Sequence, residues 1–353
     1  MKFKFITGFI RKGRNYPFRD KWYKDEPFIH IDEKKKKELK KRGFLASIDG
    51  LYDFKKYRCS DYISQRDYRQ LHPLNGSFSK LIDNKAFIPV LFKNHLEYLP
   101  DLCISIDQGF INYAYGIHSD APDIRALLQC ALQHYRELFL KPVNDSGGNN
   151  MIIVNNTNIN GIIKELEKRK SRVIINNRLK NEEYSAKIYD GSINTLRVIF
   201  FRPLGKPVKL FRIFHRFGTS ESGNVDNCSK GGMICKVNEK NGTLTDGVIF
   251  GSKYENGWYN SHTDTGFPVD GFTIPDWENK ISIIKSIIQN LNFLNYGGID
   301  IASTDTGLKI IEINSFPSIS GIQIKEPALI DEEFRKFMFS KGLRENADVH
   351  SDN

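Results

Sequence analysis

Several stretches of this 353-residue sequence predict an α+β fold. Residues 297–314 form two apolar-flanked runs joined at Gly307, which is the pattern of a β-hairpin. Residues 195–202 and 208–216 are further extended runs, connected by a turn rich in proline and glycine. Residues 278–294 place isoleucine and leucine at helical spacing, which predicts an amphipathic helix. With 40% hydrophobic residues, the chain can bury a sizeable core, divided between two or three subdomains.

The predicted hairpin carries three oxygen-bearing side chains, Asp300, Glu312 and Asn314. Glu312 and Asn314 lie two positions apart, so in a strand they point to one face, while Ile311 and Ile313 point to the other face and into a core. Carboxylate and amide oxygens are the ligands that Mg²⁺ takes, usually with waters and nucleotide phosphates completing its coordination. An ordinary hairpin with a polar outer face is the alternative.

The chain before the hairpin divides into smaller elements. Residues 1–80 mix basic and aromatic side chains and end in a turn-rich loop, which predicts a small N-terminal domain. A helix is predicted over residues 121–137, because proline and aspartate open it and apolar residues recur at helical spacing. Residues 160–169 predict a second short helix, and residues 172–177 predict a strand.

A polar glycine loop connects the predicted strands at residues 139–143 and 151–154. The centre of this loop is Ser146, Gly147 and Gly148. Backbone N–H groups in such a turn can approach phosphate oxygens that bulky residues would exclude, so the loop suits a flap over phosphates. A plain hairpin turn is the alternative.

Arginines mark the two extended runs in the middle of the chain. Arg197 lies in the first run, while Arg212 and Arg216 share one face of the second. Planar guanidinium groups hold oxyanions bidentately and stabilise charge that grows in a transition state. Converging arginines would therefore suit a transferring phosphoryl group. A set of surface arginines in salt bridges is the alternative.

The net charge of +10 favours anionic partners. The lysine run at residues 34–37 is interpreted as the solvated face of a short helix, because no nucleic-acid motif accompanies it. We therefore expect nucleotide phosphates or an acidic saccharide, and not nucleic acid, as the anions bound.

The sequence gives no sign of a membrane span, a secretory leader, a disulfide framework or a zinc site. The longest apolar runs are far shorter than the ~20 residues that a transmembrane helix needs. Lys2 and Lys4 interrupt the first apolar stretch, which is then too short for a secretory signal. The five cysteines are scattered without a C-x-x-C pair. Cys228 and Cys235 flank a double glycine, and a reactive thiol there is the alternative to a buried one. A cytoplasmic location is predicted.

The order of several short motifs resembles one protein family. The spacing of Asp300, Glu312 and Asn314 is similar to the metal-binding end of the ATP-grasp superfamily. The closest resemblance is to its sugar-transfer-associated family, which is found in bacterial capsule and surface-polysaccharide loci. The other matching segments are residues 81–85, 139–142, 145–148, 192–197, 225–227, 231–232, 262–266 and 271–277. Together these motifs span about three quarters of the chain, which makes the resemblance specific.

This resemblance implies an ATP-grasp fold in which two subdomains sandwich MgATP, with Mg²⁺ held by the three hairpin residues. The residues that it implies for nucleotide binding are Lys85, Lys141, Ser146, Gly147, Gly148, Ile175, Asn176 and Asn177. Many relatives carry a glutamate where Asn176 or Asn177 falls, so this chain departs from the family pattern along the adenine.

The resemblance also implies roles in catalysis and in substrate recognition. Arg197 and Arg216 would neutralise the phosphates during transfer. The candidates for substrate recognition are Asp226, Asn227, His262 and Asp264. Each of these four residues could instead have a structural role.

By resemblance, the chain is an ATP-dependent carboxylate-amine ligase. ATP would phosphorylate a carboxylate, and an amine would displace phosphate from the acyl phosphate. The expected divisions are an N-terminal domain (1–80), an ATP-grasp domain (81–340) and a polar tail (341–353). Family context suggests a sugar acid of a capsule or its precursor as the carboxylate, whereas the amine and the oligomeric state stay open. The alternatives are an ATP-grasp kinase and a basic binding module without enzymatic activity.

Overall fold

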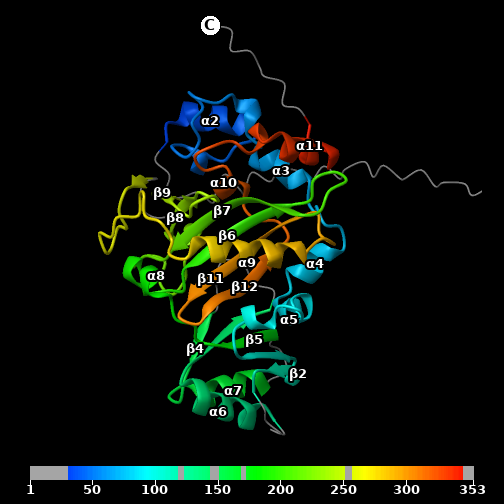
Figure 1. Ribbon diagram of the computed structural model, residues 1–353, viewed down its shortest axis with the longest axis vertical. Coiled ribbons are helices and arrows are strands. Elements are labelled where there is room, and N and C mark those ends of the chain that lie inside the picture. The colour runs from blue at the N-terminus through cyan, green and yellow to red at the C-terminus, as the bar shows by residue number, and fades with distance from the viewer. Residues whose placement is uncertain (1–30, 118–122, 144–150, 168–171, 251–256, 345–353) are drawn as a thin grey trace, which may run out of the picture.

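The computed structural model describes residues 31–117, 123–143, 151–167, 172–250 and 257–344. In this part of the chain, two antiparallel sheets follow one another along the long axis of the molecule (Figure 1). No helix among these residues is long and apolar enough to cross a membrane. The mixture of antiparallel sheets and helices confirms the predicted α+β class.

The smaller sheet has five strands in the order β2, β1, β5, β3, β4. Its strands are β1 (Cys103–Asp107), β2 (Phe110–Tyr115), β3 (Leu138–Pro142), β4 (Ile152–Val154) and β5 (Arg172–Asn177). Two helices, α6 (Ile124–Tyr135) and α7 (Ile159–Glu167), lie against this sheet and share an apolar core with it (Figure 1). Asp123 begins α6 by accepting a hydrogen bond from the backbone N–H of Ala126 at 2.8 Å.

The larger sheet has seven strands in the order β10, β9, β8, β7, β6, β11, β12. These strands are β6 (Thr195–Phe201), β7 (Lys209–Phe217), β8 (Met233–Val237), β9 (Leu244–Ile249), β10 (Gly257–Tyr259), β11 (Tyr296–Thr304) and β12 (Gly307–Asn314). Val198 and Phe200 of β6 enter one core, while Ile199 and Phe201 enter another. Both faces of the sheet are covered, which explains the continuous apolar run in this strand.

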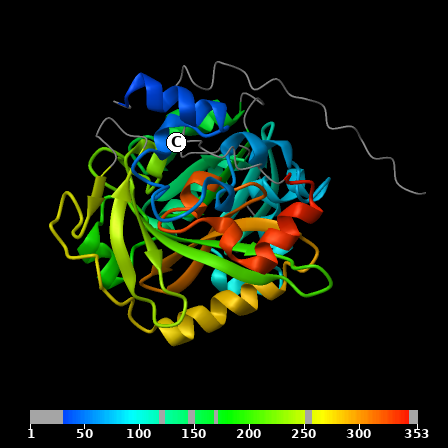
Figure 2. The ribbon, with the colours of Figure 1, turned by 90° about the horizontal axis from the view of Figure 1, so that it is seen from above.

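Helices cover the larger sheet on both sides. Figure 2 shows α9 (Trp277–Gln289) on one side of the sheet and α11 (Glu332–Ser340) on the other. The remaining α-helices are α2 (Glu33–Lys41), α3 (Gln65–Gln70), α4 (Phe78–Ile82), α5 (Ile88–Leu91), α8 (Glu183–Ile188) and α10 (Ile319–Ile322). Apolar residues between 39 and 74 share one core with β6, β7 and α11. The predicted domain boundary at residue 80 and the predicted tail stay predictions.

The hairpin of β11 and β12 departs from simple alternation at Ile311. The pairing shifts by one residue after Asp300 and Glu312, so Ile311 is the extra residue of a β-bulge. Ile310 and Ile313 are buried in the core, whereas Ile311 lines a cavity between the sheets. The prediction that Ile311 points into the core is therefore wrong, because the bulge turns its side chain toward the cavity.

Candidate active site between the two sheets

A cavity of about 1290 Å³ lies between the two sheets. Its lining comes from β3 and β5 of the small sheet, from β6, β7, β11 and β12 of the large sheet, and from α3 and the segment 224–229. Small-molecule sites usually enclose ~300–1,000 Å³, so this cavity has room for more than one ligand. Eight lysines or arginines and five aspartates or glutamates line it, which gives the wall a net positive charge.

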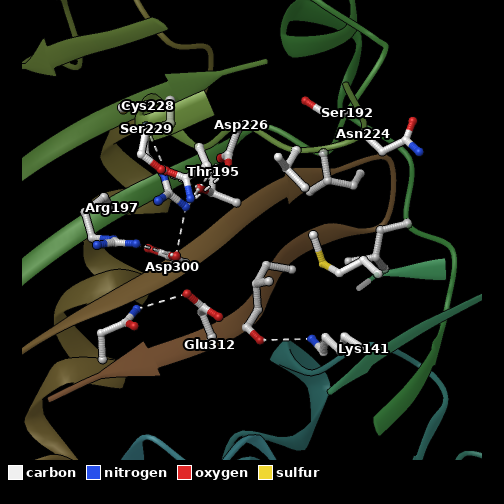
Figure 3. Close-up of a pocket in the computed structure, with 18 of the residues that line it drawn as sticks. Lys141, Ser192, Thr195, Arg197, Asn224, Asp226, Cys228, Ser229, Asp300 and Glu312 are labelled. Carbon is white, nitrogen blue, oxygen red and sulfur yellow. Dashed lines mark hydrogen bonds and ion pairs between the residues drawn. The ribbon is translucent and has the colours of Figure 1, made fainter. Parts of the chain in front are cut away.

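Arg197, Arg216 and Asp300 form the centre of the large-sheet wall. Figure 3 shows Arg197 and Asp300 side by side. Arg197 donates to both carboxylate oxygens of Asp300, with its Nη2 2.8 Å from Oδ2. Nη2 of Arg216 donates to the same oxygen at 2.8 Å. The side chain of Asp300 is only 2% exposed. Burial alone would raise the pKa of Asp300, but the two guanidinium groups outweigh burial and hold this pKa at about 2. Asp300 is therefore an anion whose two oxygens are both occupied.

The register of the strands brings these side chains together. Asp300 on β11 pairs with Arg197 on β6, and Thr195 on β6 pairs with Arg216 on β7. Residues two apart in β6 share a face, so both arginines reach the same side of the sheet. Gly298 gives the first arginine its space, because a Cβ there would lie 3.2 Å from Cδ of Arg197. Glycine at position 298 therefore leaves room for the side chain of Arg197.

A second aspartate holds Arg216 from the opposite side. Asp226 lies in the connection between β7 and β8, accepts a hydrogen bond from the Thr195 hydroxyl and lies 3.3 Å from Nη2 of Arg216. Nη2 also donates to Oγ1 of Thr195 at 2.6 Å. Burial raises the pKa of Asp226, and Arg216 opposes that rise. The guanidinium group of Arg216 is therefore fixed between two buried carboxyl groups.

Glu312 and Asn314 lie on β12 beside this arginine centre. Nδ2 of Asn314 donates to Oε1 of Glu312 at 3.1 Å, and Nζ of Lys85 lies 3.3 Å from Oε2. Glu312 is also the cross-strand partner of Asp300. Within the described residues, no three histidine, cysteine, aspartate or glutamate side chains gather closely enough to hold a metal by themselves. The Glu312 carboxylate and the Asn314 amide oxygen fit a hard cation that takes further ligands from a nucleotide, whereas both oxygens of Asp300 already accept from arginines.

Lys141 reaches across from the small sheet. It lies on β3, is 7% exposed, and its Nζ donates to the carbonyl oxygen of Ile311 at 3.3 Å. Burial and the nearby ammonium group of Lys85 lower the pKa of Lys141 to about 8. Among the described residues, no carboxylate lies within ion-pair distance of Lys141. A bound phosphate would bring a negative charge within ion-pair distance of Lys141.

Strand β5 uses its asparagine side chains within the small sheet. Nδ2 of Asn176 donates to the carbonyl oxygen of Leu102 at 2.9 Å, and Oδ1 of Asn177 accepts from the Leu102 N–H at 3.0 Å. Both asparagines also line the cavity. Ile175 does not, because its side chain is buried in the core beneath α6 and α7. The side chain of Ile175 therefore faces the core, and a contact of its backbone with a nucleotide stays a prediction.

Three residues of the predicted phosphate flap, Ser146, Gly147 and Gly148, lie outside the described residues. The flap therefore stays a prediction.

Several cavity residues were not predicted. The unpredicted lining residues include Arg178, Leu179, Lys180, Thr195 and Cys228. The first three follow directly after β5, where the chain leaves the sheet beside the cavity. Thr195 stands two positions before Arg197, and that spacing was the signal that it shares the arginine's face.

The four predicted substrate residues fall into two groups. Asp226 and Asn227 line the cavity. His262 and Asp264 do not line it, and their side chains instead form hydrogen bonds with the start of the connection between β7 and β8. The structure therefore places only the first pair where a ligand in the cavity could touch them.

One protein family and several solved structures are similar to this chain. Residues 65–337 match the family described as sugar-transfer associated ATP-grasp. Among solved structures, D-alanyl-alanine synthetase A from Vibrio cholerae is similar with a TM-score of 0.45 and 12% identity, over 76% of this chain and 66% of that chain. N5-carboxyaminoimidazole ribonucleotide synthetase, in an ADP complex, is similar with a TM-score of 0.44 and 12% identity, over 77% of this chain and 58% of that chain.

A third similar structure is the ATP-grasp ligase PsnB, complexed with a minimal precursor, Mg and ADP. Its TM-score is 0.38 and its identity 12%, over 71% of this chain and 55% of that chain. This chain thus spans less than two thirds of the length of each of these three proteins. No curated protein sequence matches it.

The family match covers more than three quarters of the sequence and includes every strand of the cavity wall. It confirms the predicted ATP-grasp fold, in which two antiparallel sheets face each other across one cavity. The chain belongs to the sugar-transfer associated ATP-grasp family.

Proposed function

We propose that this protein is an ATP-dependent carboxylate-amine ligase that forms an amide through an acyl phosphate. The observation that carries the proposal is the convergence of Arg197 and Arg216 on Asp300, beside Glu312 and opposite Lys141. This arrangement surrounds one point of the cavity with cations and hard oxygen ligands, which is what a transferring phosphoryl group requires.

The two lysines bind the nucleotide phosphates in this proposal. Lys141 reaches the cavity from the small sheet, and Lys85, whose backbone N–H donates to the carbonyl oxygen of Val143 after β3, approaches Glu312 from the same side. Because burial and mutual repulsion lower the pKa of Lys141 to about 8, an incoming phosphate stabilises its ammonium form. Asn176 and Asn177 restrain the adenine side of the cavity through their hydrogen bonds to the backbone of Leu102, the residue before β1.

The two arginines stabilise the charge that develops during transfer. Arg216 is fixed between Asp226 and Asp300, so its fork is oriented before any substrate arrives. Such preorganised donors need no rearrangement at the moment of reaction. Arg197 supports the same point from the neighbouring strand.

Glu312, Asn314 and Asp300 would hold Mg²⁺ together with the nucleotide. The ion would neutralise phosphate charge and orient the γ-phosphoryl group. Both oxygens of Asp300 are occupied by guanidinium groups, so Glu312 and Asn314 are the donors with fewer competing partners.

The substrate is proposed from the charge of the cavity and the family description. A wall with more cations than anions suits an acid in addition to ATP, and the volume of about 1290 Å³ leaves room for both. The sugar-transfer association of the family favours a sugar acid of a capsule or surface polysaccharide, or its precursor. We propose the cytoplasm as the compartment, because ATP is available there.

The experiment pairs sugar acids that carry ¹⁸O in the carboxylate with candidate amines, ATP and Mg²⁺. A ligase of this type releases ADP and phosphate, forms an amide and transfers one ¹⁸O atom to the phosphate. Hydroxylamine in place of the amine should trap the acyl group as a hydroxamate. ADP release with a stable phosphoester and no free phosphate would establish a kinase instead. No ATP turnover with any pair would favour a binding module.

A further inference from the structure

The connection between β7 and β8 carries Asp226, Asn227 and Cys228 to the cavity, and a turn outside the cavity holds its beginning. This turn consists of residues 262–266 and lies between β10 and α9 in the chain. Its backbone closes on itself, because the N–H of Gly266 donates to the carbonyl oxygen of His262 at 2.8 Å.

Three side chains of the turn bind two other parts of the molecule. Nε2 of His262 donates to the carbonyl oxygen of Gly218 at 2.8 Å. Asp264 accepts from the backbone N–H of Ser220 at 2.7 Å and from its hydroxyl at 2.8 Å. The third side chain, Thr265, donates from Oγ1 to the carbonyl oxygen at the end of α8, at 2.8 Å. The turn therefore links the connection to α8, which packs against the larger sheet.

His262 is suited to a permanent hydrogen bond. It is 1% exposed and its ring stacks on Tyr189, with the ring centroids 5.2 Å apart. Burial lowers the pKa of His262, which keeps the imidazole neutral. A neutral ring that donates from Nε2 presents Nδ1 as an acceptor, and the backbone N–H of Asp264 lies 3.4 Å from it.

The restraint continues along the connection to the arginine centre. Oγ1 of Thr219 donates to the carbonyl oxygen of Gly231 at 2.9 Å, which joins the two ends of the connection. Oγ of Ser222 is 2.6 Å from the carbonyl oxygen of Val225, the residue before Asp226. A short series of bonded residues thus leads from the turn to the carboxyl group that holds Arg216.

We infer that the turn at residues 262–266 positions Asp226, and through it the guanidinium group of Arg216, for the proposed phosphoryl transfer. His262 and Asp264 are positioning residues and do not contact the substrate. The inference rests on the proposed function only for its kinetic consequence, because the restraint on the connection can be measured without any reaction.

The first test uses Cys228 as a reporter of the connection. Its thiol is half-buried and burial raises its pKa to about 11, so we expect slow alkylation in the wild type. Asp264→Asn leaves one acceptor oxygen where the wild type has two. We expect the alkylation rate of Cys228, followed by peptide mass spectrometry, to rise about tenfold on loss of this charged hydrogen bond. Cys130, a half-buried thiol on α6, should react at an unchanged rate.

The second test compares kinetic constants in the same variant. We expect kcat to fall about tenfold through misplacement of Arg216, while KM for ATP is unchanged because the phosphate lysines lie on other elements. Ser220→Ala should have the same effect as Asp264→Asn, and the double variant should add little to either one. Asp270→Asn is the matched control, since Asp270 is an exposed acid that lies between the turn and α9.

Each outcome decides the inference. An alkylation rate of Cys228 equal to that of the wild type in Asp264→Asn would overturn it, as would a rise in KM for ATP at unchanged kcat. If the wild type turns over no ATP, the proposed function fails, but the alkylation rates still decide whether the turn restrains the connection.

Discussion

The two walls of the cavity present their positive charges in opposite ways. On the large sheet, Arg197 and Arg216 are already paired with buried aspartates. On the small sheet, the side chain of Lys141 donates to a carbonyl oxygen, and burial lowers the pKa of its ammonium group to about 8. Paired guanidinium groups have a fixed geometry before substrate binds, whereas an ammonium group that has no close carboxylate among the described residues gains its partner on binding. We therefore assign transition-state stabilisation to the large-sheet wall and ground-state nucleotide binding to the small-sheet wall.

The largest effect is expected at Glu312, where the large-sheet wall would meet the metal. Glu312→Ala should lower ATP turnover by ~10³-fold or more, because loss of a metal ligand removes several kcal/mol of charge stabilisation. The side chain is partly exposed, so the thermal midpoint of unfolding should change little. Coupled-enzyme detection of ADP measures the first quantity and calorimetry the second. A folded variant with near-normal turnover would remove Glu312 from the metal site.

The next effect separates the two walls through Arg216. Arg216→Lys should lower kcat on the order of 10²-fold with little change in KM for ATP, because lysine keeps the charge but loses the bidentate fork. Steady-state kinetics at saturating acceptor measure both constants. If KM rises alone while kcat holds, Arg216 belongs with the ground-state binders and the division between the walls is wrong.

Lys141 gives the small-sheet wall a pH dependence. Above about pH 8 the free protein loses the Lys141 proton, while bound phosphate favours the ammonium form, so ATP affinity should fall as pH rises from 8 to 9.5. The expected loss approaches ~10-fold per pH unit at the upper end. Lys141→Arg stays charged throughout this range, so its affinity should not follow the same decline. Equal pH profiles for the wild type and Lys141→Arg would show that another group titrates.

The smallest effect is expected at Gly298, beneath the stem of Arg197. A Cβ at this position would lie 3.2 Å from Cδ of Arg197 and 3.1 Å from Cβ of Pro317, so Gly298→Ala should shift the arginine by a few tenths of an ångström. We expect kcat to fall by about three- to tenfold. Gly161→Ala is a matched control in open space on α7. Normal kcat in Gly298→Ala would mean that the position of Arg197 is not critical.

The sequence predicts the regular elements of this fold well where the pattern is local. The prediction of a strand over residues 172–177 agrees with β5, and the hairpin lies where its two apolar runs indicated. The bulge at Ile311 could not be predicted, because an inserted residue leaves no mark on a period-two pattern of isoleucines. Its consequence is large, since the same bulge presents the carbonyl oxygen to which Lys141 donates.

The contacts of individual side chains were harder to predict than the strands that carry them. Arg212 shares the predicted face with Arg216, yet it donates to the carbonyl oxygens of Ile322, Glu326 and Pro327 and does not line the cavity. Its partners come from the C-terminal segment, more than a hundred residues away. His262 likewise belongs to a recognisable motif, but only the tertiary structure brings it against the connection between β7 and β8.

The most direct test of the division between the two walls is a calorimetric titration of MgATP into the wild type, Lys141→Ala and Arg216→Lys under the same conditions at pH 7.5. Lys141→Ala should bind MgATP more weakly by about 1.5–3 kcal/mol, the usual range for losing a hydrogen bond to a charged group. Arg216→Lys should bind MgATP with nearly the affinity of the wild type. Unchanged affinity in Lys141→Ala together with a large loss in Arg216→Lys would contradict the account.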